Sequence, residues 1–90
     1  MPTVKFTRNL NRFYPNLKTV SSSGKTLEDV INDVDNQFPG IINYILDEHG
    51  SIRKHVQIFI QNQALQNRDE LGTPVQASDE VYIMQALSGG

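Results

Sequence analysis

The sequence predicts a small two-layer α+β domain in which one amphipathic helix covers one face of a β-sheet. Stretches near both ends of the chain alternate apolar and polar residues as strands do. One central stretch repeats apolar residues at helical spacing, and no internal repeat or low-complexity segment interrupts the pattern. Because 90 residues suffice for one core, we expect residues 1–90 to form a single domain, with residues 87–90 as a projecting C-terminal tail.

The first two strands are expected to form a hairpin with a long connection. Residues 3–7 alternate so that Val4 and Phe6 lie on one face. The polar stretch 8–16 contains a proline that interrupts strand pairing. The second strand is therefore expected near residues 17–21.

One helix is expected to begin after Thr26, whose side chain can accept a hydrogen bond from a free amide of the first turn. Glu28 and Asp29 lie near the positive end of the helix dipole. The apolar stripe of this helix consists of Leu27, Val30, Ile31, Val34 and Phe38. Pro39 and Gly40 end the helix, and residues 41–46 are expected to add one or two irregular turns at the edge of the core.

The C-terminal half is expected to contribute three more strands. Residues 56–61 are the clearest strand, with three β-branched residues on one face. A tight turn at Asn62 and Gln63 leads into a short strand at residues 64–66. After a loop, residues 81–84 form the last strand.

Composition excludes several functional classes. A net charge of −2 provides no basic surface for phosphates, so we expect no nucleic-acid partner. The absence of cysteine excludes disulfides, thiolate metal sites and a cysteine nucleophile. The N-terminus lacks an apolar signal region, and no stretch approaches the roughly 18 apolar residues of a membrane span. We therefore expect a cytoplasmic protein without a membrane partner.

Three weak motifs do not predict chemistry. Residues 24–26 resemble the end of a phosphate-binding loop, but the first glycine of that motif is missing. His49 and His55 are six positions apart without cysteine partners, so no metal site is expected. The acidic pairs at residues 47–48 and 69–70 are typical of solvated turns.

The end of the chain is the strongest functional signal. The tail residues, which directly follow the last predicted strand, are Leu87, Ser88, Gly89 and Gly90. Four residues extend about 13 Å, and glycine fits a narrow channel because it has no Cβ. We therefore expect the tail to thread its terminal carboxylate into a pocket of another protein.

This plan resembles ubiquitin and, more closely, the ThiS/MoaD-type sulfur carriers of the β-grasp fold. The resemblance covers the whole chain. It depends on the tail, the last strand with residues 79–84, the strand at residues 56–60 after a basic turn, and the helix opening at residues 24–27. The additional segment 41–55 makes the chain look most similar to the small subunit of molybdopterin synthase and to the carrier of the cysteine-synthesis pathway.

The resemblance implies a carrier protein with no catalytic residues or bound cofactor of its own. A ubiquitin-activating-type adenylating enzyme would use ATP and magnesium to join AMP to the Gly90 carboxylate. A sulfur donor would displace the AMP and leave a thiocarboxylate, and a sulfur-accepting synthase would then take the sulfur.

Several alternatives stay open. The chain could be a ubiquitin-like modifier conjugated to lysines, or the dedicated small subunit of molybdopterin synthase. It could also be a binding module in which the diglycine is incidental. The final sulfur acceptor is not identified by the sequence.

A docking surface is expected on the sheet. Alternation places Phe59, Tyr82 and Met84 on the face opposite to the helix and beside the tail. Aromatic residues and Met are enriched at partner sites, so these three side chains are expected to contact a partner. Leu87 is expected to pack in a partner groove and set the register of the tail. The alternative is that loops or Leu17 cover this face.

Overall fold

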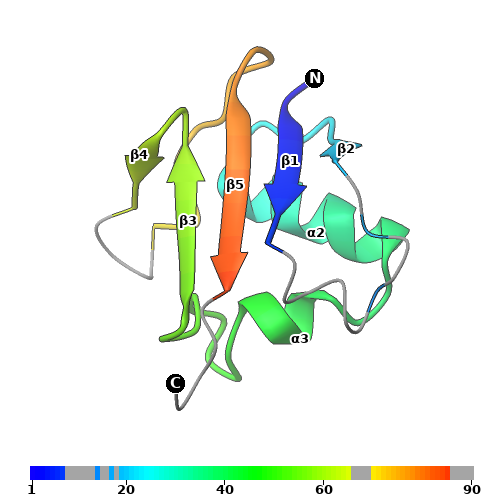
Figure 1. Cartoon of the computed structure of the whole chain (residues 1–90), viewed down its shortest axis with the longest axis vertical. Helices are drawn as coiled ribbons and strands as arrows, with labels where there is room; N and C mark the ends of the chain where they lie inside the picture. Colours follow the sequence, from blue (N-terminus) through cyan, green and yellow to red (C-terminus); the bar gives the residue numbers. More distant parts are fainter. Residues whose placement is uncertain (8–13, 15–16, 18, 66–69, 86–90) are drawn as a thin grey trace.

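The computed structural model describes residues 1–7, 14, 17, 19–65 and 70–85, and it contains one mixed five-stranded sheet with a main helix across one face (Figure 1). The expected α+β class is confirmed. The strands are β1 (Thr3–Phe6), β2 (Val20–Ser21), β3 (Val56–Ile60), β4 (Gln63–Ala64) and β5 (Glu80–Gln85). The helices are α2 (Leu27–Gln37) and α3 (Ile42–Ile45).

The last strand lies in the centre of the sheet, whose order is β2-β1-β5-β3-β4. β5 pairs in parallel with β1, so that Val4 faces Val81, and antiparallel with β3, so that Ile58 faces Ile83. The N-terminal hairpin is confirmed, because β2 pairs antiparallel with β1 and Val20 also faces Val4. Its second strand is shorter than the expected residues 17–21, since Leu17 and Thr19 lie outside β2. The first and last strands of the domain are therefore neighbours.

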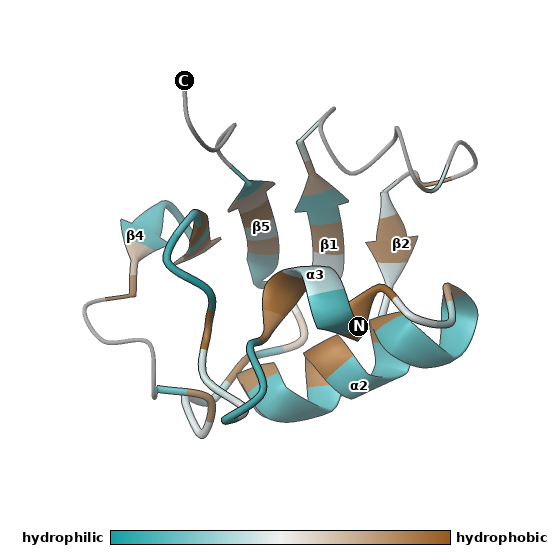
Figure 2. Ribbon diagram, turned by 90° about the horizontal axis from the view of Figure 1, so that it is seen from below, coloured by the Kyte–Doolittle hydropathy of each residue, from teal (hydrophilic) through white to brown (hydrophobic). Residues whose placement is uncertain are grey.

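The helix forms as the sequence predicts. The hydroxyl of Thr26 accepts the N–H of Asp29 at 3.2 Å and caps the first turn. The four apolar residues within α2 are buried, while Phe38 at its C-terminal end is half-buried. Figure 2 shows the hydrophobic side of α2 facing the sheet and its hydrophilic side turned away. Burial of this stripe holds the two layers together.

A single core fills the space between the sheet and the helices. Its buried side chains are Val4, Leu17, Leu27, Val30, Ile31, Val34, Ile41, Ile45, Ile52, Val56, Ile58, Val75, Val81 and Ile83. The expected turns at residues 41–46 are confirmed as α3 and its flanks, which contribute two of these side chains. No helix among the described ranges is long and apolar enough to cross a membrane.

The turn between β3 and β4 differs from the prediction by one residue. The two turn residues are Gln61, with φ 50°, and Asn62, with φ 68°, and Ile60 faces Gln63 across the turn. The predicted turn at Asn62 and Gln63 and the strand at residues 64–66 were therefore wrong in position. Two consecutive positive φ values match the right-handed twist of a hairpin, so the geometry of the turn outweighed the weak turn preference of Gln61.

Gly24 packs directly against the first turn of α2. A Cβ at this position would lie 2.6 Å from the backbone nitrogen of Val30 and 2.9 Å from the carbonyl carbon of Asp29. The N–H of Gly24 also donates to the hydroxyl of Ser22 at 3.0 Å, and Ser22 is fully buried. The glycine that resembles a phosphate-binding loop therefore allows the chain to pass close to the helix.

Gly24→Ala is expected to destabilise the domain by about 1–3 kcal/mol, because the backbone that the new methyl group meets has no free rotamer with which to move away. Gly72→Ala is the matched control, since a Cβ at that position meets nothing within 4 Å. Thermal unfolding measures both variants. Equal melting temperatures would contradict the close packing of Gly24.

Candidate functional site

The candidate site is the end of β5, from which the chain continues into the predicted tail. The tail residues Leu87, Ser88, Gly89 and Gly90 lie outside the described residues. The last described residue, Gln85, faces Val56 of β3. On its other side, the N–H of Gln85 donates to the hydroxyl of Thr7 at 3.2 Å. Gln85 therefore has a neighbour on each side, Val56 of β3 and the residue that follows β1.

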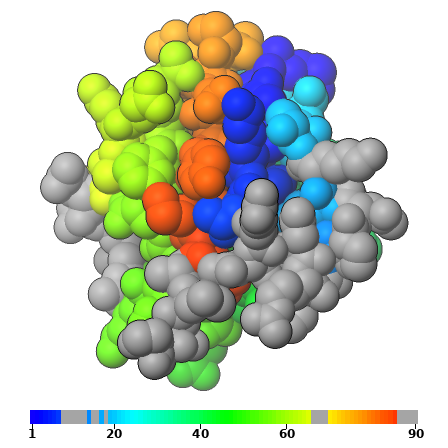
Figure 3. All heavy atoms as spheres, in the orientation of Figure 1, coloured from blue at the N-terminus to red at the C-terminus, as the bar shows by residue number. Residues whose placement is uncertain are grey.

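The three predicted docking residues lie together on the outer face of the sheet. Tyr82 in β5 faces Phe59 in β3 on one side and Lys5 in β1 on the other. The rings of Phe59 and Tyr82 meet edge to face, with centroids 6.4 Å apart and an interplanar angle of 72°. Met84 lies one row nearer the tail, opposite Gln57. Figure 3 shows this face, with the side chains of β5 between those of β1 and β3.

These docking residues are half-buried and do not form an open apolar patch. Among the described residues, Met1 is the only large hydrophobic residue that is mostly exposed, with an exposed fraction of 68%. Leu17, which we considered as a cover for this face, is 4% exposed and belongs to the core. The edge-to-face contact of the rings themselves accounts for part of the burial of this face.

Polar groups surround this apolar centre. The ammonium of Lys5 lies 3.2 Å from a carboxylate oxygen of Glu80, and both side chains are nearly half exposed. The side-chain amide of Gln57 donates to the carbonyl of Leu65 at 3.2 Å. An apolar centre with a polar rim is the usual anatomy of a protein interface. The outer face therefore has the chemical character expected of a docking surface.

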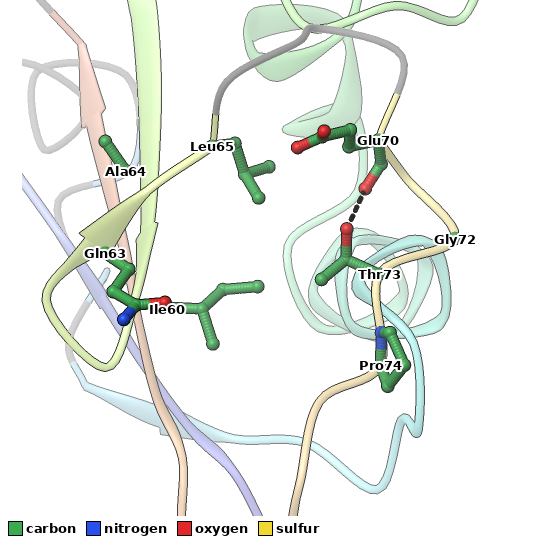
Figure 4. A pocket seen from close by; sticks show the side chains of 8 residues that line it. All are labelled: Ile60, Gln63, Ala64, Leu65, Glu70, Gly72, Thr73 and Pro74. Carbon is green, nitrogen blue, oxygen red and sulfur yellow. Dashed lines mark hydrogen bonds between the residues drawn. The ribbon is translucent and has the colours of Figure 1, made fainter.

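A groove of about 930 Å³ lies at the other end of β3, between β4 and residues 70–74 (Figure 4). Ile60 and Leu65 supply apolar lining, and the hydroxyl of Thr73 donates to the carbonyl of Glu70 at 2.7 Å. Among the described residues of the lining, Glu70 is the one that is ionisable. Because β3 begins opposite Gln85 and ends at Ile60, the length of this strand separates the groove from the last described residue of β5.

The predicted absence of a metal site concerned His49 and His55. His49 lies on an exposed turn, with its Nε2 3.6 Å from a carboxylate oxygen of Glu48. Within the described parts of the chain, no group of three or more His, Cys, Asp or Glu residues is arranged to hold a metal ion.

Asp47 has a structural role that sequence reasoning missed. Its carboxylate accepts the N–H of His49 at 2.8 Å and that of Ser51 at 3.0 Å. These bonds, the one from Ser51 above all, lower the pKa of Asp47 below its ordinary value. The signal in the sequence was an Asp followed three positions later by Gly50, which has φ 80°. This loop precedes the basic turn that leads into β3.

The order and pairing of these elements define the ubiquitin-like β-grasp fold. The chain belongs to the ThiS family, whose profile matches residues 4–90. It is a sulfur carrier of that family, similar to CysO, and not an enzyme.

The similar proteins include two carriers with the same name. The sulfur carrier protein CysO of Mycobacterium tuberculosis is 32% identical over 75 residues, which are 81% of each chain. The crystal structure of CysO from this organism superposes with a TM-score of 0.84 at 28% identity and covers 97% of this chain and 100% of that one. The structure of the Amycolatopsis orientalis BexX/CysO complex has a TM-score of 0.86 at 22% identity, covers both chains fully and supports the fold.

The stability that the Asp47 carboxylate contributes is expected to depend on pH. Because its pKa is lower in the folded state than in the unfolded state, this contribution is complete above about pH 4 and is lost as the pH falls through the folded pKa. Urea unfolding of the wild type and Asp47→Asn at several pH values measures it. The wild type should be more stable at pH 7, and the difference should shrink below about pH 4. A difference that is constant with pH would contradict the role of the charge.

Proposed function

We propose that the group on which this carrier works is the Gly90 carboxylate, which a partner enzyme converts to a thiocarboxylate in the cytoplasm. The observation that carries the proposal is the family match, which extends through residue 90. The pairing of Gln85 within the sheet supports it, because residues 86–90 can extend about 16 Å beyond a residue that is bonded to the sheet. A channel in a partner could then receive the tail while the folded domain stays outside.

The chemistry requires activation, because a free carboxylate is a poor electrophile. A carboxylate oxygen of Gly90 attacks the α-phosphorus of ATP, and pyrophosphate leaves to give an acyl-adenylate. A sulfide-level donor then attacks the carbonyl carbon, and AMP leaves. The activating enzyme supplies ATP, magnesium and the stabilisation of the developing charges. This chain supplies the carbon that carries the sulfur.

The accepting synthase is proposed to belong to a cysteine-forming pathway. This choice over a molybdopterin pathway is supported by the 32% identical relative, which is named as the sulfur carrier CysO. The thiocarboxylate sulfur would attack an electrophilic carbon of an amino-acid precursor, and the leaving group of that carbon would depart. Hydrolysis of the resulting thioester would then release the thiol and regenerate the Gly90 carboxylate.

The outer face of the sheet is proposed to dock the activating enzyme. Phe59 and Tyr82 form a rigid aromatic pair in one row across the sheet, and Met84 lies beside the start of the tail. If the activating enzyme binds this face, the tail would lie next to the enzyme surface that contacts the sheet. Leu87 is proposed to set the register of the tail in the partner.

Intact-mass spectrometry tests the function. After incubation with an adenylating enzyme from the same cells, ATP and sulfide, the wild-type mass should rise by the difference between one sulfur and one oxygen. A variant that lacks Gly90 should not change.

Other outcomes distinguish the alternatives. Covalent conjugates to lysines would indicate a modifier, and stable co-purification with a larger subunit would indicate a synthase component. No mass change with any activating enzyme of the cell would overturn the proposal in favour of a binding module.

Phe59→Ala is expected to raise the KM of the carrier in the adenylation reaction about tenfold with little change in kcat, as the loss of a central interface anchor does. Asn32→Ala, on the exposed side of α2, is the control and should leave KM unchanged. The assay is run below the melting temperature of both variants. An unchanged KM for Phe59→Ala would exclude this face as the docking surface.

A further inference from the structure

We propose that Thr7 is a positioning residue, whose hydroxyl fixes the point at which the tail leaves the sheet. The inference rests on the proposed function, because it concerns how the same tail is presented to the activating enzyme. It is carried by the hydrogen bonds between the end of β1 and the end of β5.

The ladder between β1 and β5 changes its pattern at its last rung. The N–H of Thr7 donates to the carbonyl of Ile83 at 3.2 Å, as in a regular parallel pair. In a regular ladder, the N–H of Gln85 would next donate to the backbone carbonyl of Thr7. It donates instead to the hydroxyl of Thr7 at 3.2 Å. The side chain of Thr7 thus takes the place of its backbone carbonyl as the acceptor. As a result, β5 is bonded on this side as far as its last residue, Gln85, although β1 ends at Phe6.

The opposite end of β5 uses a similar device. The N–H of Glu80 donates to the side-chain oxygen of Gln61 at 2.7 Å. There, the N–H of Gln61 also donates to the carbonyl of Glu80 at 2.9 Å, so two bonds hold the first residue of the strand. At the tail end, the hydroxyl of Thr7 is the acceptor that links the last residue of β5 to β1. Loss of this oxygen would therefore remove the described bond between Gln85 and the residue that follows β1.

Fraying at Gln85 would change how the tail enters a partner. It would loosen the last described residue of β5, from which the chain continues into the tail. Loss of one hydrogen bond lowers the population that is ready for insertion by about 2- to 10-fold. Once the tail is inserted, the same Gly90 carboxylate reacts, so the effect should appear in KM and not in kcat.

Three variants test the role of the hydroxyl. Thr7→Val keeps the shape and removes the acceptor, whereas Thr7→Ser keeps the acceptor. Thr3→Val makes the same change at the other end of β1, where Thr3 faces Glu80. Amide hydrogen exchange of Gln85 is measured by NMR on the free protein, and KM and kcat are measured by ATP–pyrophosphate exchange with the activating enzyme.

Thr7→Val should speed the exchange of Gln85 and raise KM about 2- to 10-fold, while Thr7→Ser and Thr3→Val behave as the wild type. If the amide exchange of Gln85 were unchanged in Thr7→Val, the hydroxyl of Thr7 would not hold the N–H of Gln85, and the proposal would be overturned. Faster exchange with an unchanged KM would overturn the positioning role. If the wild type itself is not adenylated, the proposed function and the positioning role both fail, and the exchange data alone decide whether the hydroxyl holds Gln85.

Discussion

The structure depends on the position of β5 between β1 and β3. Its parallel pairing with one strand and antiparallel pairing with the other place Val81 and Ile83 at the centre of the core, where both are fully buried. α2 covers this inner side with its apolar stripe. The alternate side chains of the same strand, Tyr82 and Met84, form the outer face. One strand therefore supplies the centre of the core, the centre of the proposed docking surface and the base of the tail.

The elements of the fold could be predicted because their signals are local. The helical spacing of the apolar residues and the cap at Thr26 identify α2, and alternation identifies β1, β3 and β5. The turn after β3 was misplaced because positive φ values at Gln61 and Asn62 are imposed by the twist of the hairpin. Glycine is the residue that most readily adopts a positive φ, so the sequence gave no sign that Gln61 would adopt a positive φ.

The site could be predicted only in part. Alternation assigns Phe59, Tyr82 and Met84 to the outer face, but it does not report how far they cover one another. The hydroxyl of Thr7 was not singled out, because its partner lies 78 positions away in the sequence. The sequence did not assign Gly24 to a phosphate-binding loop, but it also did not show that Gly24 packs against the backbone of α2. The periodicity of a sequence does not predict contacts between distant segments.

The pairing of the first strand with the last also has a kinetic consequence. Joining segments so distant in the chain requires closure of a long loop, which is slow compared with the formation of α2 or the β3–β4 hairpin. The centre of the sheet should therefore be completed late in folding. Until then, the hydroxyl of Thr7 cannot accept the N–H of Gln85. If Thr7 positions the tail as proposed, an incompletely folded chain would be a poor substrate for activation, and sulfur would be loaded preferentially onto molecules that have finished folding.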